Sequence, residues 1–90
     1  MKVRYSRRAF HDLENIRTYI AKDNLEAARR VASFIRQSIS KLEEFPYQGR
    51  ATDEKNAHRL VVTRYPYIVH YRVLKTQIDI VTILHAAQNQ

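Results

Sequence analysis

Cysteine and tryptophan are absent from this sequence of 90 residues, and glycine occurs only once. Without cysteine the chain can form neither a disulfide nor a thiolate metal site, which favours a reducing cytoplasm as its natural setting. The single glycine, Gly49, excludes the glycine-rich loops that cradle nucleotide phosphates. No apolar run is long enough for a secretory signal or a membrane-spanning helix. These absences predict a cytoplasmic protein without membrane contact.

Acidic residues are also scarce, because 9 Asp and Glu stand against 16 Lys and Arg, a net charge of +7. Arginine outnumbers lysine by 11 to 5, and a guanidinium group is better suited to bidentate contacts with phosphate or carboxylate. The charge therefore indicates one of two partner classes, nucleic acid or an acidic protein. A basic surface that serves only solubility is a third interpretation.

The first half of the chain has the apolar spacing of helices. Apolar residues recur on one face from Arg7 to Lys22 and again from about Leu25 to Glu44, where a Phe-Pro pair ends the pattern. Ser6 is the predicted N-cap of the first helix, and Asp23 and Asn24 are alternative caps of the second. The short break between the two segments predicts an antiparallel helical hairpin.

The second half has the patterns of strands. His58 to Val73 is predicted to form two strands joined by a tight turn, with Pro66 either at the turn or at the start of the second strand. Ile78 to Leu84 is almost wholly apolar and suits a central strand. Lys2 to Tyr5 is a candidate first strand, and the polar segment from Gln48 to Ala57 is expected to be a loop.

These elements predict one domain, residues 1–90, of the α+β class with the order β-α-α-β-β-β. The helical hairpin is expected to pack on one face of a small, mostly antiparallel sheet. A chain of this length buries only about 60–65% of its unfolded surface, so the other face stays open. Arg59, Arg72 and the histidines are candidates for display on that face.

The sequence contains no metal-binding or nucleophile motif. Its histidines are scattered, although His58 and His70 have the opportunity to approach across the predicted hairpin. A zinc site needs three or four converging ligands, and we therefore expect no metal and no cofactor. Asp12 and Glu14 are two residues apart on a helix and do not face each other, so they do not form an acid/base pair.

Four segments together carry a resemblance to a known superfamily. They are AFHDLENIRTYIAKDNLEAARRV (Ala9 to Val31), FPYQGR (Phe45 to Arg50), HRLVVTRYPYIVHYRV (His58 to Val73) and ILHAAQ (Ile83 to Gln88). In this order they resemble the RelE/ParE superfamily, the toxins of bacterial type II toxin–antitoxin systems. The resemblance spans nearly the whole chain and implies the same β-α-α-β-β-β fold.

The resemblance implies one of two activities. RelE-like members enter the ribosomal A site and cleave mRNA, which requires a general base, a general acid and cations around the reacting phosphate. ParE-like members have no established hydrolytic site; they poison DNA gyrase and block replication. Ile68 stands where many RelE-like enzymes carry an arginine, and Ala86 and Ala87 stand near the position of their C-terminal His or Tyr. The sequence therefore favours a ParE-like gyrase inhibitor without enzymatic activity, with a RelE-like mRNA endoribonuclease as the alternative.

Target contacts are expected from basic residues of the hairpin and the last strand. Arg72 is expected either to face solvent or to pair with Asp79. If the protein is a nuclease, the catalytic candidates are Arg59, Arg72 and His85. The predicted target-binding residues are Arg59, Arg64, Arg72 and His85.

A cognate antitoxin, ParD-like or related, follows from the resemblance, and the two proteins are expected to form a hetero-oligomer. Its acidic, partly disordered segment would fold over apolar and basic surface together. Tyr19 and Phe34 lie off the apolar stripes of the two helices, where they either pack at the edge of the core or form an exposed apolar patch for a partner. The predicted docking groove is bordered by Leu13, Ile16, Tyr19, Val31 and Phe34.

Overall fold

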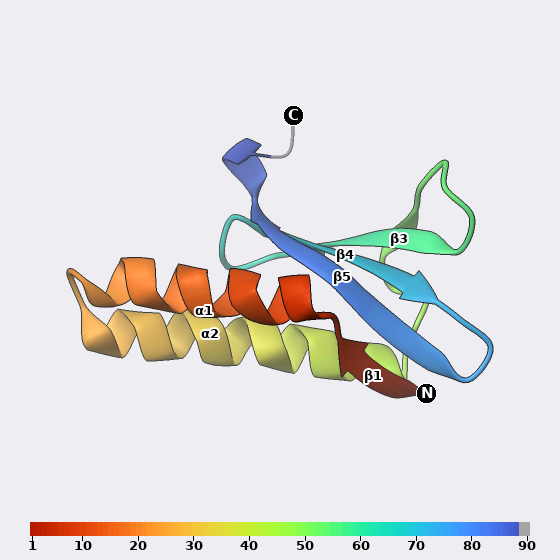
Figure 1. Cartoon of the computed structure of the whole chain (residues 1–90), viewed down its shortest axis with the longest axis horizontal. Coiled ribbons are helices and arrows are strands. Elements are labelled where there is room, and N and C mark those ends of the chain that lie inside the picture. Colours follow the sequence, from red (N-terminus) through yellow and green to blue (C-terminus); the bar gives the residue numbers. More distant parts are fainter. Residues whose placement is uncertain (89–90) are drawn as a thin grey trace.

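Two helices cover one face of a five-stranded sheet in the computed structural model, which describes residues 1–88 (Figure 1). Both predicted helices are present and form a hairpin, and the α+β fold is confirmed. None of the helices in the described part of the chain has the length and apolar character to cross a membrane. The helices are α1 (Arg7–Ala21) and α2 (Leu25–Ser40).

Each helix begins at a side-chain cap. The Ser6 hydroxyl accepts a hydrogen bond from the Ala9 amide at 2.9 Å, as predicted. Between the two alternative caps of α2, Asn24 is the one that acts, because its side-chain oxygen accepts from the Ala27 amide at 3.0 Å. The expected end of α2 at Glu44 is too late: the α-helix ends at Ser40 and tightens into the single 3₁₀ turn η1 (Lys41–Glu43).

The sheet has the strand order β1-β5-β4-β3-β2, with β1 parallel to β5 and every other pair antiparallel. The last strand, β5, has an inner position between β1 and β4, as its apolar sequence predicted, but β4 is the middle strand and β5 is not buried on both faces. The segment expected to be a loop contains the very short β2, which pairs Arg50 with Arg59. A strand of two residues within a polar segment has no periodic pattern, so the sequence did not predict it. The strands are β1 (Lys2–Tyr5), β2 (Arg50–Ala51), β3 (Ala57–Val62), β4 (Tyr67–Val73) and β5 (Gln77–His85).

Alternation along the strands gives the sheet an inner face toward the helices and an outer face away from them. In β3, Leu60 and Val62 are buried in the core, whereas Arg59 and Val61 are exposed. The register of β5 shifts between its pairs with His70 and Tyr71, which leaves one extra residue in β5. This bulge lets its isoleucines on both sides of the shift face the core, namely Ile78, Ile80 and Ile83.

The first helix closes the free edge of β5. Strand β1 pairs with β5 only as far as Ile80. Beyond that point, Ser6 donates its amide to the Ile80 carbonyl at 2.9 Å and its hydroxyl to the Val81 carbonyl at 2.9 Å. Nearly two turns further along α1, the Asp12 carboxylate accepts the Ile83 amide at 3.0 Å. Three backbone groups of this edge thereby have partners without another strand.

Tyr71 joins β4 to the chain that follows α2. Its side chain is 1% exposed, and its hydroxyl donates to the Pro46 carbonyl at 2.8 Å while accepting the Gly49 amide at 2.9 Å. A Cβ on Gly49 would lie 2.7 Å from that hydroxyl oxygen. The only glycine of the chain therefore stands where the backbone approaches a buried tyrosine too closely for any side chain.

We expect Tyr71→Phe to destabilise the fold by about 1–2 kcal/mol, because it leaves the Gly49 amide and the Pro46 carbonyl without a partner. Urea unfolding followed by far-UV circular dichroism measures the change. Tyr47→Phe is the matched control, since Tyr47 is 67% exposed and loses no buried hydrogen bond. Equal stability of the two variants would contradict the role assigned to the Tyr71 hydroxyl.

Candidate functional site

The outer face of the sheet carries two of the four predicted target-binding residues. Arg59 in β3 and Arg72 in β4 both point to this face, because their neighbours along each strand are buried against the helices. The register places Arg59 directly opposite His70, and His70 opposite Thr82 of β5. Arg59 has no ion pair among the described residues, so its guanidinium group is available to a partner.

Arg72 is held by the loop between β2 and β3. Its guanidinium group lies 3.2 Å from the Glu54 carboxylate and donates to the Lys55 carbonyl at 3.3 Å. Asp79, the partner considered from sequence, instead accepts a hydrogen bond from Gln77 at 2.6 Å. Arg72 therefore faces solvent, which is one of the two arrangements expected from the sequence. It is already paired with the Glu54 carboxylate, which an anion from a binding partner would have to displace.

His70 occupies the middle of the outer face and was not singled out as a target-binding residue from the sequence. Its Nε2 is buried and has no hydrogen-bond partner in the described part of the chain. Burial, and next the positive charge of Arg59, lower the pKa of this imidazole below its ordinary value of 6.5, while Glu54 opposes the shift. The sequence signal was its position two residues before Arg72 in an alternating strand.

His58 and His70 do not approach each other, and that expectation is wrong. His58 is 9% exposed and lies on the inner face, where it stacks on Tyr71 with ring centroids 5.3 Å apart. Residues 58 and 70 differ by one position in the register of the hairpin, because His58 pairs with Tyr71 and Arg59 pairs with His70. A shift of one residue places a side chain on the opposite face.

His85 lies apart from Arg59 and Arg72. It pairs with Tyr67 at the far end of β4, and their rings meet edge to face at 5.3 Å. Its Nδ1 accepts the Ala87 amide at 3.1 Å, which holds the start of the 3₁₀ turn η2 (Ala86–Gln88). Tyr67 belongs to the inner face, so His85 does not share the outer face with the two arginines.

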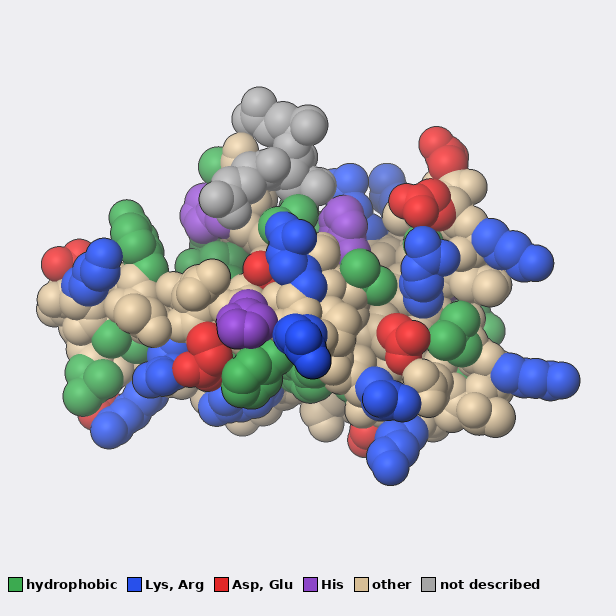
Figure 2. Space-filling model, viewed as in Figure 1, with side chains coloured by type: hydrophobic (Ala, Val, Ile, Leu, Met, Phe, Trp, Pro, Cys, Tyr) green, Lys and Arg blue, Asp and Glu red, His purple; other side chains and the backbone are tan. Residues whose placement is uncertain are grey.

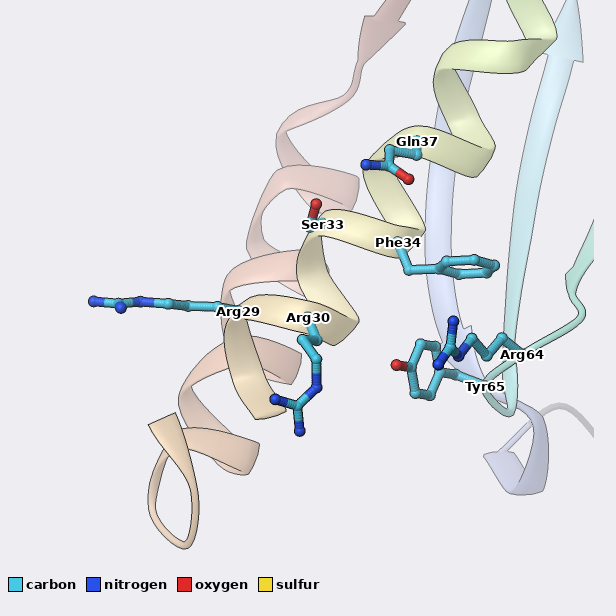
Figure 3. Close-up of a pocket in the computed structure, with 7 residues that line it drawn as sticks. All are labelled: Arg29, Arg30, Ser33, Phe34, Gln37, Arg64 and Tyr65. Atoms are coloured by element: carbon cyan, nitrogen blue, oxygen red, sulfur yellow. The ribbon is translucent and has the colours of Figure 1, made fainter. Parts of the chain in front are cut away.

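Arg64 lies in the turn between β3 and β4, on a second surface. Its guanidinium carbon is 5.9 Å from the ring centroids of both Phe34 and Tyr65. Phe34 and Tyr65 meet edge to face at 5.5 Å, and Figure 3 shows Phe34 pointing from α2 toward this turn. These side chains line an open pocket of about 320 Å³ between α2 and the turn, together with Arg29, Arg30, Ser33 and Gln37.

The predicted antitoxin-binding residues divide by burial. Leu13 and Val31 are core residues with 4% and 6% exposure, so they support the helices and add little surface of their own. Ile16 and Phe34 are half-buried, and Tyr19 is 72% exposed. The apolar surface available for docking therefore centres on Tyr19 and on the pocket beside Phe34.

Positive charge surrounds these surfaces. Lys and Arg side chains project from both ends and from the helices in Figure 2, with fewer acidic side chains between them. The acidic residues of the described chain are largely engaged in local contacts, such as the pair of Glu14 with Arg17 at 2.8 Å. Within residues 1–88 no group of three or more His, Asp or Glu side chains is arranged to hold a metal ion.

The placement of His70 generates a prediction about its titration. A lowered pKa in the folded state means that protonation of His70 opposes folding. The free energy of unfolding should therefore fall as the pH drops through about 6.5, where the unfolded chain begins to bind this proton. Arg59→Gln removes the neighbouring positive charge and should raise the pKa of His70. NMR titration of the imidazole nitrogens measures the pKa of His70 in the wild-type protein and in the variant. Arg29→Gln, a change of equal charge on α2, should leave the pKa of His70 unmoved; an equal response to both variants would contradict the placement.

The chain is similar to known proteins along nearly its whole length. Residues 3–90 match the family model described as the ParE toxin of the type II toxin–antitoxin system parDE. The chain is 37% identical over 87 residues to Y4kP of Sinorhizobium fredii, a protein named as a toxin, covering 97% of this chain and 90% of that protein. It is 36% identical over 81 residues to Toxin RelE2 of Caulobacter vibrioides, covering 90% of each.

The fold agrees with the sequence comparisons. The chain superposes on a chain of the chromosomal ParDE toxin–antitoxin system from P. aeruginosa with a TM-score of 0.84 and 25% identity, covering 94% of this chain and 95% of the other. The resemblance read from the four sequence segments is thereby confirmed over nearly the full length. This chain belongs to the ParE toxin family of type II toxin–antitoxin systems.

Proposed function

We propose that this protein arrests bacterial growth by poisoning DNA gyrase, without cleaving RNA itself, until a cognate antitoxin neutralises it. Membership of the ParE toxin family supports the gyrase target. Toxin RelE2 of C. vibrioides carries the name of the other branch, so the choice between the two activities depends on the geometry of the candidate residues.

The observation that carries the proposal is the separation of Arg72 from His85. In β4, Arg72 lies five positions beyond Tyr67, the partner of His85. At about 3.3 Å per residue this is about 16 Å along the strand, and the two side chains leave the sheet on opposite faces. No single phosphate can contact both of them, whereas RNA cleavage needs proton-transfer groups and cations around one phosphate.

The RelE-like alternative finds little support at the other positions. Ile68, which stands in place of the arginine of many RelE-like enzymes, is 4% exposed. Ala86 and Ala87 in η2 carry no titratable group. His70 lies near Arg59, but its buried Nε2 and lowered pKa favour a neutral imidazole, and it faces no second proton-transfer histidine because His58 is on the inner face.

The antitoxin is proposed to dock on the helical side of the molecule. Tyr19 on α1 and the pocket formed by Phe34, Arg64 and Tyr65 offer apolar surface next to cationic side chains. A segment with alternating acidic and apolar residues would satisfy both, and a disordered segment would fold as it covers them. The same surface is bordered by Arg29 and Arg30, which extends the positive rim.

The gyrase proposal is tested with purified protein and plasmid DNA. We expect supercoiling to be inhibited and linear DNA to accumulate with protein dose, because a trapped cleavage complex releases linear product on denaturation. Addition of the antitoxin should restore supercoiling. Unaffected gyrase together with mRNA cleavage in the A site of programmed ribosomes would overturn the proposal in favour of the nuclease.

The docking proposal is tested by measuring antitoxin affinity of surface variants by calorimetry. Tyr19→Ser and Phe34→Ser should each weaken binding by about 1–3 kcal/mol, the usual cost of truncating an apolar anchor. Phe10→Ser is the matched control, since Phe10 is an exposed aromatic residue on α1 outside the predicted groove, at 57% exposure. Unchanged affinity in both test variants, or an equal loss in the control, would show that the antitoxin docks elsewhere.

A further inference from the structure

The register of the outer face brings one lateral row of donor side chains across four strands. Arg50 in β2 is opposite Arg59 in β3, Arg59 is opposite His70 in β4, and His70 is opposite Thr82 in β5. Directly opposite residues of antiparallel strands share a face. We name Arg50, Arg59, His70 and Thr82 the donor row.

The donor row contains two neighbouring positive charges that no carboxylate within residues 1–88 neutralises. Arg50 and Arg59 are like charges in a directly opposite position, an arrangement that destabilises a sheet unless an anion lies between them. Neither arginine has an ion pair among the described residues. His70 adds a buried Nε2 without a partner. A bound anion would relieve the repulsion between the two arginines, and the His70 imidazole beside them would respond to its charge, although its Nε2 is itself buried.

The rows on either side determine what kind of anion fits. On one side the register aligns Val61, Ile68 and Leu84, an aliphatic row without an aromatic ring. On the other side lie Arg72 and Asp79, the latter opposite Arg4 of β1. The outer face therefore offers cations in series, and the flanking rows add no aromatic ring on which an unpaired base can stack; the one ring of the row itself, the His70 imidazole, has a buried Nε2.

We propose that the donor row is a contact site for the phosphate backbone of a nucleic-acid duplex. Strands are spaced by about 4.8 Å, so the four positions span about 14 Å and can follow successive phosphates along a groove edge. Guanidinium forks match phosphate oxygens, and the net charge of +7 attracts a polyanion over the whole molecule. This site does not depend on gyrase, and it would let the toxin hold DNA in its own right.

Binding to the donor row is measured by fluorescence anisotropy of a labelled DNA duplex at several salt concentrations. We expect Arg50→Gln and Arg59→Gln each to weaken binding by about fivefold and to lower the slope of log affinity against log salt by about one, as for the loss of one phosphate contact. Arg59→Lys should keep the slope, because a point charge still neutralises the phosphate. Melting temperatures establish that each variant is folded.

The matched control is Arg29→Gln, which removes the same charge from α2 at a side chain 66% exposed. Equal losses in this control and in the donor-row variants would overturn the proposal, since the attraction would then be general. A single strand that binds more tightly than the duplex would also overturn it, and so would a polyglutamate peptide bound more tightly than DNA through Arg59, which would identify an acidic protein as the occupant.

The imidazole supplies an independent readout. His70 is faced by Arg59 of β3 and Arg72 of its own strand, by Asp79 of β5, by Arg50 one strand beyond, and by Glu54 of the loop. A bound phosphate favours the protonated imidazole, so duplex affinity should rise between about pH 7.5 and 5.5. In His70→Gln this rise should disappear, and an equal rise in that variant would contradict the role of His70.

Failure here and failure of the gyrase proposal are distinguishable. The anisotropy experiment contains no gyrase, and the gyrase experiment is read with the wild-type chain. Duplex binding through the donor row with unaffected gyrase would leave the contact site standing and change only the target. Gyrase poisoning without duplex binding would overturn the contact site and leave the proposed function intact.

Discussion

The whole arrangement depends on the attachment of α1 to the free edge of β5. Strand β1 ends at Tyr5, so the edge of β5 beyond Ile80 lacks a neighbouring strand. Ser6 and Asp12 supply the missing partners to its backbone. Because a carboxylate and a hydroxyl on the first turns of α1 hold the edge, α1 is fixed against β5, and α2 follows it back across the sheet (Figure 1). The part of β5 that β1 does not reach is thus completed by a helix in place of a further strand.

This attachment commits both helices to one face, and the consequences reach the outer face. The core lies between the helices and the inner face, and a chain of this length has no further element to cover the other side. Apart from the aliphatic row of Val61, Ile68 and Leu84, the outer face carries polar and charged side chains, and the register of the strands determines which of them lie opposite each other. The short strand β2 places Arg50 opposite Arg59. The two positive charges repel each other, and a bound anion would reduce this repulsion.

Sequence patterns predicted the helices, the hairpin and the class of the fold because apolar periodicity records which side chains face the core. They also predicted that Arg59 and Arg72 face outward. They missed β2, whose two residues carry no period, and they placed His58 beside His70, because one position of register determines the face and no pattern shows register. Glu54, which neutralises Arg72, lies in a loop whose path depends on the Asn56 residue at φ 63°. Such contacts come from tertiary placement, which is why the internal partner of Arg72 could not be read from the chain.

The two proposed surfaces lie on opposite layers, and this has a consequence for neutralisation. An antitoxin segment confined to Tyr19 and the pocket beside Phe34 would leave the donor row open. The β3–β4 turn joins them, because Arg64 and Tyr65 line the pocket while Val61 and Ile68, on either side of the turn, pair on the outer face. An acidic segment that continues over this turn would bring its carboxylates to Arg59 and compete with phosphate there. An antitoxin segment that blocks the donor row with its carboxylates must therefore be long enough to extend over the β3–β4 turn. A shorter segment would act only through the surface that it covers beside α2.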